Sequence, residues 1–260
     1  MKFFSSLMKG LGRDAAPRGK AGARAYAVGD IHGRLDLLDA LLARIEADMA
    51  AREPRRTFIV FLGDLIDRGA DSAGVVERLR TYRPRHARPI FLAGNHEEVM
   101  LEILGGRADI LADWMKFGGA ECAASYGIDV DRLRRMDEAE ALEVLRKAVP
   151  RAHVEFLEGF GDTFSFGDYL FVHAGIRPGL ALDAQDRKDL RWIREPFLSD
   201  VKEHGFMVVH GHTIVETVQE RPNRIGIDTG AYRSNVLTAL AVEEDRRWYL
   251  STAPEDGGQR

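Results

Sequence analysis

Residues 58–69 read FIVFLGDLIDRG, an apolar run that ends in a glycine-bounded polar cluster. A short, unbroken apolar run predicts a buried strand, here Phe58–Leu62. Glycine directly after a strand permits the tight turn that lets short side chains converge at the strand's end. Ligands of open α/β sheets bind just outside the carboxyl ends of strands. Asp64, Asp67 and Arg68 are therefore candidate site residues.

The same arrangement occurs at four other places in the chain. The clusters GDIHG (29–33), GNHE (94–97), HAG (173–175) and GHT (211–213) each follow an apolar run, namely Ala25–Val28, Pro89–Leu92, Tyr169–Val172 and Met207–Val209. Together the five strand ends supply carboxylate, imidazole and amide side chains: Asp30, His32, Asp64, Asn95, His173 and His212. Mixed oxygen and nitrogen ligands of this kind suit a pair of divalent metal ions.

The remaining pattern predicts a mixed α/β (α+β) fold. Leucines and isoleucines at spacings of three and four between Leu35 and Met49 predict an amphipathic helix, and Ser72–Tyr82 predicts a second one. The first half thus consists of β-α-β units. The later strands, which include Ile225–Ile227, Val236–Val242 and an edge at Trp248–Leu250, follow too closely for helices between them. We expect a sandwich of two sheets flanked by helices.

Residues 98–160 interrupt this pattern with short helical stretches, namely Glu98–Leu104, Ile110–Phe117 and Glu138–Ala148. We interpret this region as an inserted helical cap. The 260 residues otherwise suffice for one domain, which we place at 25–251, with a C-terminal tail at 252–260.

Residues 1–24 carry six basic side chains and one acidic one. We expect a flexible basic tail, since chain ends are usually poorly ordered. The alternative is a weak interfacial membrane contact through Phe3, Phe4 and Leu7.

Composition excludes several classes of protein. With 37 basic and 41 acidic residues, a net charge of −4 gives no electrostatic case for binding nucleic acid. The single cysteine, Cys122, allows no internal disulfide and fits the cytoplasm, and we expect it to contribute to packing. No apolar run approaches the roughly 18 residues of a membrane-spanning helix. The sequence does not determine the oligomeric state.

The motif series resembles the calcineurin-like metallophosphoesterase superfamily, and GDLIDRG and GNHE resemble its bacterial serine/threonine phosphoprotein phosphatases. The similarity runs from Ala25 to Thr238 and includes Trp114–Tyr126 (WMKFGGAECAASY). It implies a β-sandwich with two metal ions at one edge. Asp30 and His32 would belong to the first ion, Asp64 would bridge, and the second would take Asn95, His173 and His212. Manganese is the expectation, although iron, zinc, cobalt or nickel would suit the same ligands.

The resemblance also implies how the reaction proceeds. A hydroxide shared by two ions would attack the phosphorus, and His96 would protonate the leaving oxygen. Asp67 would orient His96, and Arg68 would bind the phosphate oxygens with its planar guanidinium. A second phosphate-binding arginine is expected, for which Arg191 and Arg194 are the candidates. We favour Arg194, and the alternative interpretation of Arg191 is a surface residue.

The other histidines are expected to be secondary. His210 would support the metal ligands through hydrogen bonds without binding a metal itself. We interpret His86, His153 and His204 as surface or structural residues.

Three functions remain open at this stage. The leading hypothesis is hydrolysis of phosphoserine or phosphothreonine in proteins. The alternative is a symmetrical diadenosine tetraphosphate hydrolase. Glu97, which is not expected to bind metal, favours the phosphatase because the hydrolase branch tends to have aspartate there. A catalytically silent phosphoprotein-binding module is disfavoured, since every candidate ligand and the acid are present. The partner is thus a phosphoprotein or a phosphorylated small molecule.

Overall fold

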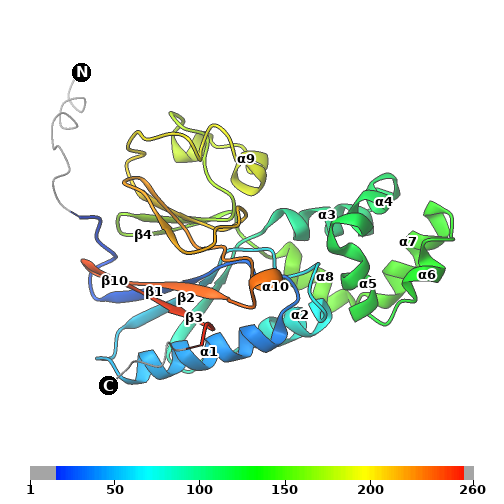
Figure 1. Cartoon of the computed structure of the whole chain (residues 1–260), viewed down its shortest axis with the longest axis horizontal. Helices are drawn as coiled ribbons and strands as arrows, with labels where there is room; N and C mark the ends of the chain where they lie inside the picture. Colours follow the sequence, from blue (N-terminus) through cyan, green and yellow to red (C-terminus); the bar gives the residue numbers. More distant parts are fainter. Residues whose placement is uncertain (1–15, 255–260) are drawn as a thin grey trace, which may run out of the picture.

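The computed structural model describes residues 16–254 as two five-stranded mixed sheets with helices around them (Figure 1). The first sheet has the order β10-β9-β1-β2-β3, with β1 (Ala23–Val28), β2 (Arg56–Phe61), β3 (Ala87–Phe91), β9 (Thr238–Glu243) and β10 (Arg246–Ser251). The second has the order β4-β5-β6-β8-β7, with β4 (Thr163–Phe166), β5 (Tyr169–Val172), β6 (Met207–His210), β7 (Gln219–Glu220) and β8 (Arg224–Gly226). The expected sandwich with a helical insertion is confirmed.

Each sheet contains three adjacent parallel strands. In the first sheet β1 pairs in parallel with β2, and β2 with β3, while β9 and β10 run antiparallel. In the second, β5, β6 and β8 are parallel, and β4 and β7 are antiparallel edges. The carboxyl ends of parallel neighbours lie at one edge of a sheet, so each sheet presents three loops together.

The core follows from the two-residue period of the strands. Tyr26 and Val28 of β1 face α1 (Leu35–Ala50) and α2 (Ser72–Arg80), whereas Ala25 and Ala27 face the second sheet. A third cluster lies between the second sheet and α9 (Arg187–Trp192). Helices therefore cover the outer faces of both sheets (Figure 1).

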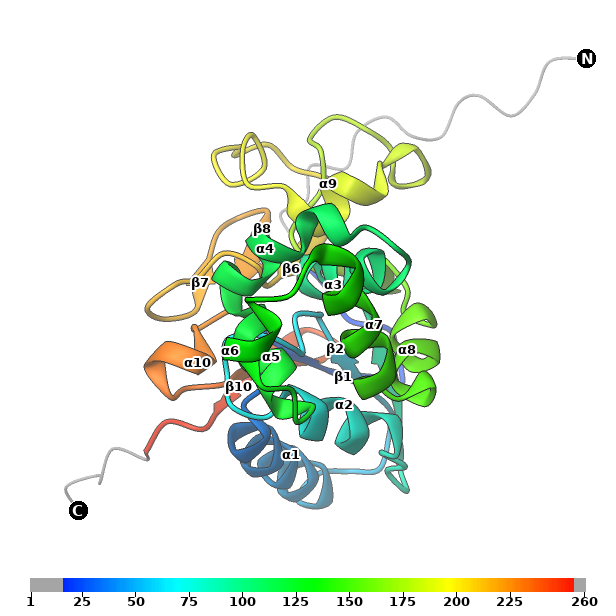
Figure 2. The ribbon, with the colours of Figure 1, turned by 90° about the vertical axis from the view of Figure 1, so that its right-hand side faces the viewer.

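The insertion between β3 and β4 is a run of short helices, seen in front in Figure 2. It comprises α3 (Asn95–Leu104), η1 (Ala108–Ile110), α4 (Leu111–Trp114), η2 (Met115–Gly119), α5 (Ala120–Ser125), α6 (Val130–Leu133), α7 (Glu138–Ala148) and α8 (Arg151–Glu158). The helical stretch predicted at Ile110–Phe117 is present but is not one regular α-helix. The chain there passes through a 3-10 turn, a short α-helix and a π-helix, because Phe117 and Gly118 leave helical dihedral angles.

The region after β5 also corrects the sequence-based expectation. η3 (Leu182–Ala184) and α9 lie between β5 and β6, where we predicted no helix. The physical reason is that β5 and β6 are parallel, and parallel neighbours need a long crossover connection. β4, β7 and α10 (Ala231–Ser234) were not predicted either.

Part of the expected basic tail belongs to the folded chain. The backbone N–H of Arg18 donates to Asp168 at 2.9 Å, and β1 already begins at Ala23. Arg24 is buried and forms an ion pair with Glu243. Residues 1–15, with the expected membrane-contacting side chains, and residues 255–260 lie outside the described part. Within residues 16–254, no helix is long and apolar enough to cross a membrane.

Candidate active site

The loops after the parallel strands bring all six predicted metal ligands together. Asp30 and His32 follow β1, Asp64 follows β2, and Asn95 opens α3 after β3. His173 and His212 follow β5 and β6 of the second sheet. All six side chains are buried.

Hydrogen bonds link the two sheets at this edge. The Oδ1 atom of Asn95 lies 2.8 Å from Nδ1 of His212 and 3.1 Å from Nε2 of His173. The backbone N–H of His212 donates to the Asp30 carboxylate at 3.0 Å. Loops that are far apart in sequence therefore form one constellation.

The backbone around the site is held in an unusual conformation. Five site residues have φ in the left-handed region, between 47° and 71°: His32, Asp64, Asp67, Arg68 and His212. Side chains other than glycine rarely adopt this region, and such strain clusters at functional sites. The surrounding fold fixes these side chains where an unconstrained loop would not hold them.

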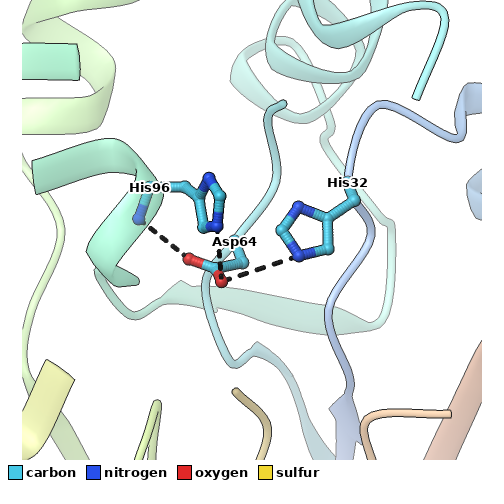
Figure 3. Close-up of side chains that lie close together, drawn as sticks. All are labelled: His32, Asp64 and His96. Atoms are coloured by element: carbon cyan, nitrogen blue, oxygen red, sulfur yellow. Dashed lines mark hydrogen bonds and ion pairs between the residues drawn. The ribbon is translucent and has the colours of Figure 1, made fainter. Parts of the chain in front are cut away.

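Asp64 is the centre of two groups of potential metal ligands. His32, Asp64 and His96 form one group, and Asp64, His173 and His212 form the other, with the ligand atoms of each group within 4.8 Å of one another. Figure 3 shows the first group, in which Nε2 of His32 lies 3.7 Å from Oδ2 of Asp64. His96 thus lies among the potential ligands, although the sequence assigns it to acid catalysis.

Electrostatics shows that these residues fit divalent cations. The carboxylates of Asp30, Asp64 and Asp228 are buried close together, and burial with the charges of Asp228 and Asp64 raises the pKa of Asp30 well above its ordinary value. Burial lowers the pKa of His32 and of His212 to about 3, which keeps both imidazoles neutral, as metal ligands must be. Nε2 of His212 is buried without a hydrogen-bond partner. A cation would neutralise the carboxylates, and Nδ1 of His212, 2.8 Å from Oδ1 of Asn95, is the nitrogen that lies beside another candidate ligand.

Asp228 was missed by the sequence reasoning. It follows β8 and is 1% exposed, and burial, with a further contribution from the charge of Asp64, raises its pKa to about 6. The signal was present, because the predicted strand Ile225–Ile227 ends in Asp-Thr-Gly, as the other site strands end in polar, glycine-containing clusters. The strand ends thus deliver a third buried carboxylate.

His96 forms a tight pair with Asp67. Its Nδ1 lies 2.6 Å from Oδ2 of Asp67, and the indole N–H of Trp114 donates to the same carboxylate at 3.0 and 3.2 Å. Burial raises the pKa of Asp67. Burial opposes a charge on His96, but Asp64 and Asp67 outweigh it and raise the pKa of that histidine. Trp114, from the insertion, was not singled out from the sequence.

Arg68 lies beside both histidines of the first group. One guanidinium nitrogen is 3.2 Å from Nε2 of His32 and another is 3.1 Å from Nε2 of His96. The guanidinium also stacks over the ring of Tyr232, with 4.9 Å to the centroid. The planar guanidinium held in this way can donate parallel N–H groups to an anion that lies beside the two histidines.

Glu97 connects two of the loops. Its carboxylate accepts hydrogen bonds from the backbone N–H groups of Asp64 and Gly94 at 2.9 Å and of Leu65 at 2.8 Å. Burial and the charge of Asp64 raise its pKa to about 7. Through these hydrogen bonds Glu97 fixes the backbone of the loop that carries Asp64.

Of the two candidate arginines, Arg191 is not a surface residue as we expected. Its side chain is 12% exposed and forms ion pairs with Asp162 and Glu98. Arg194 is exposed, and its charge contributes, after burial and His173, to the lowered pKa of His212. Ion pairing occupies Arg191, so Arg194 remains the candidate for binding phosphate.

The remaining histidines have ordinary surroundings. His153 is buried between the Tyr126 hydroxyl at 3.0 Å and Glu77 at 3.1 Å, which is a structural role. His210 donates from Nδ1 to the carbonyl of Gly211 at 3.0 Å, and its supporting role stays a prediction. Cys122 is buried, as expected for packing.

Comparison with known proteins fits this geometry. A model of the calcineurin-like phosphoesterase family matches residues 23–239. The chain belongs to this family. Within it, the chain is 26% identical to serine/threonine-protein phosphatase 2 of Salmonella typhimurium over an alignment of 229 positions, which covers 84% of this chain and 92% of the relative.

A second relative has a different activity. The chain is 26% identical to a symmetrical bis(5'-nucleosyl)-tetraphosphatase of Methylobacillus flagellatus over 294 positions, which cover 89% of this chain and 96% of the relative. The crystal structure of a cold-active protein-tyrosine phosphatase from a Shewanella species matches with a TM-score of 0.57 and 18% identity, covering 88% of this chain and 80% of that one. This last likeness concerns the fold alone.

Proposed function

We propose that this phosphoesterase hydrolyses phosphoserine and phosphothreonine in proteins. The observation that carries the proposal is the His96–Asp67 pair, 2.6 Å long, with Arg68 3.1 Å from the other nitrogen of the same imidazole. This arrangement supports a role for His96 as proton donor beside Arg68 as phosphate-binding group. A serine alkoxide is a poor leaving group, so its departure depends on such a donor.

In this proposal the chain's own residues bind the phosphate and move the proton. Arg68, with Arg194, binds the non-bridging phosphate oxygens. Water attacks the phosphorus, the bond from phosphorus to the serine oxygen breaks, and Nε2 of His96 gives its proton to that oxygen. The products are inorganic phosphate and a serine hydroxyl. Asp67 holds His96 through Nδ1 so that Nε2 faces the leaving oxygen.

The two groups that share Asp64 support the proposed ligand sets, to which the sequence adds Asp30 and Asn95, while His96 of the first group is assigned to proton transfer. Asp30, His32 and Asp64 would hold the first ion, and Asp64, Asn95, His173 and His212 the second. Two divalent ions bound there supply activation of the attacking water and charge stabilisation on the phosphoryl oxygens. Manganese is our proposal for the native metal.

Alignment length supports a phosphatase of the Salmonella type over the symmetrical tetraphosphatase. The 294 aligned positions with the tetraphosphatase exceed the 260 residues of this chain, so that alignment contains many gaps. The alignment with the Salmonella phosphatase is 229 positions long for 84% of the chain and needs few. Extra segments of the tetraphosphatase are thus absent from this chain, and substrate selection depends on such additions to a shared site.

The test compares the two substrates directly. Metal-stripped protein is reconstituted with manganese, and kcat/KM is measured for a phosphoserine peptide and for diadenosine tetraphosphate in parallel. We expect the peptide to be the better substrate and its hydrolysis to fall by about 10² to 10⁴ in His96→Asn. A higher kcat/KM for diadenosine tetraphosphate would contradict the proposal and identify the alternative hydrolase. Activity on neither substrate would favour a binding module.

A further inference from the structure

The π-helix of the insertion, Met115–Gly119, packs directly on the loop that carries Arg68. The carbonyl of Gly118 accepts a hydrogen bond from the backbone N–H of Arg68 at 3.0 Å. Gly118 has φ of 113°, and a Cβ atom there would lie 2.5 Å from Cγ and 2.6 Å from the backbone nitrogen of Arg68. The contact therefore requires glycine, and it fixes the position of the neighbouring Phe117.

Phe117 itself does not join the core. Its side chain is 66% exposed, a high value for a large apolar residue. Phe117 lines an open cavity of about 540 Å³ together with Met115, Tyr232 and four charged side chains, those of Arg68, Lys116, Glu121 and Arg134. Single exposed apolar residues are common on protein surfaces, but this one lies beside the arginine of the active site.

We call this space the Phe117 cavity. Arg68 lines it and also lies beside the reacting groups. The backbone and aliphatic part of Arg68 contact Gly118, whereas its guanidinium is 3.1 Å from Nε2 of His96. A serine oxygen that receives the proton of His96 therefore lies close to that guanidinium. The residues on either side of this serine therefore lie next to the Phe117 cavity. A cavity of this volume can hold a few side chains.

We propose that the Phe117 cavity binds the residues next to the phosphorylated serine and selects substrates with a bulky apolar residue there. Phe117 and Met115 pack against that side chain, and the phosphate stays on Arg68. This inference rests on the proposed function. The insertion then contributes to substrate selection, because the exposed ring of Phe117 contacts the residue next to the phosphoserine.

The experiment uses two phosphoserine peptides that differ only in the residues flanking the phosphoserine, leucine in one and glycine in the other. The readout is the ratio of their kcat/KM values. We expect wild type to prefer the leucine peptide and Phe117→Ala to lower this ratio by about tenfold, mainly through KM, because a buried side-chain contact is lost. Phe117→Leu should retain most of the preference, since it keeps an apolar surface.

Val201→Ala is the matched control, because Val201 is an apolar residue that is 83% exposed and lies outside the cavity lining. Its ratio should equal that of wild type. A wild type that hydrolyses both peptides equally, or a ratio unchanged in Phe117→Ala, would overturn this inference alone. A wild type that hydrolyses diadenosine tetraphosphate but neither peptide would overturn the proposed function and this inference with it.

Discussion

The strand-end loops and the helical insertion place their side chains in different ways. The candidate metal ligands at the strand ends are buried, and five site residues, Asp64 among them, have positive φ, so their positions are set by the two sheets. The insertion consists of helices of three to eleven residues, and beyond the first residues of α3 it reaches the site mainly through Trp114 and Gly118. The difference suggests a division of labour, in which the sheets carry the chemistry and the insertion positions the acid and contacts the substrate.

We expect the largest loss of activity from a substitution at the strand ends. Asp64→Asn should reduce hydrolysis to the level of metal-stripped protein, because Asp64 belongs to both ligand groups. Metal content by atomic emission should fall below the two ions per chain that we expect for wild type. A chelator should abolish wild-type activity, and manganese should restore it. Full activity after rigorous metal removal would contradict the assignment of chemistry to this edge.

The next effect separates proton transfer from metal binding. His96→Asn should lower kcat for a phosphoserine peptide by about 10² to 10⁴ and lose less on p-nitrophenyl phosphate, whose leaving group needs no proton. Arg68→Ala should penalise both substrates about equally, partly through KM, because it removes a phosphate contact common to both. An equal loss on both substrates in His96→Asn, or loss of a metal ion from it, would show that His96 is a ligand instead of the acid.

A third substitution tests whether the insertion positions the strand-end residues. Gly118→Ala should lower kcat/KM roughly 10- to 100-fold, because the added Cβ displaces Arg68 and small displacements of a binding group are costly. Gly127→Ala is its control, since Gly127 also has positive φ, 78°, but has nothing within 4 Å of a Cβ. Both variants should lose thermal stability, measured as Tm, and only Gly118→Ala should lose activity. Equal activity of Gly118→Ala and Gly127→Ala would contradict the proposal that the insertion positions Arg68.

The smallest effect concerns the support of Asp67. Trp114→Phe removes the indole N–H that donates to the Asp67 carboxylate at 3.0 Å while keeping an aromatic ring. A hydrogen bond to a charged group is worth about 1.5–3 kcal/mol, so kcat on the phosphoserine peptide should fall about tenfold or more. Because Trp114 acts through Asp67 and His96, p-nitrophenyl phosphate should be affected less. A uniform loss on both substrates would indicate a merely structural role.

Sequence patterns were sufficient where one local signal repeated. Apolar runs ending in glycine and polar residues predicted six strands of the sandwich, of which five are buried and β3 is partly exposed, and named all six potential ligands that the structure brings together. In the insertion they predicted the helical stretch at Ile110–Phe117 but not its kink at Phe117 and Gly118. The physical reason is that Gly118 adopts φ of 113° to pack on Arg68, a contact made across the fold that no local periodicity contains.

The sequence by itself determined which chemical groups stand at the ends of the parallel strands, since alternating burial and glycine turns are local properties of the chain. Only the tertiary structure decided how these groups are joined. It placed Asp228 among the buried carboxylates, set Trp114 on Asp67, and tied Arg191 to Asp162 and Glu98. Each of these contacts joins residues that are distant in sequence, and such pairs are fixed by the packing of the two sheets and the insertion, not by any local preference.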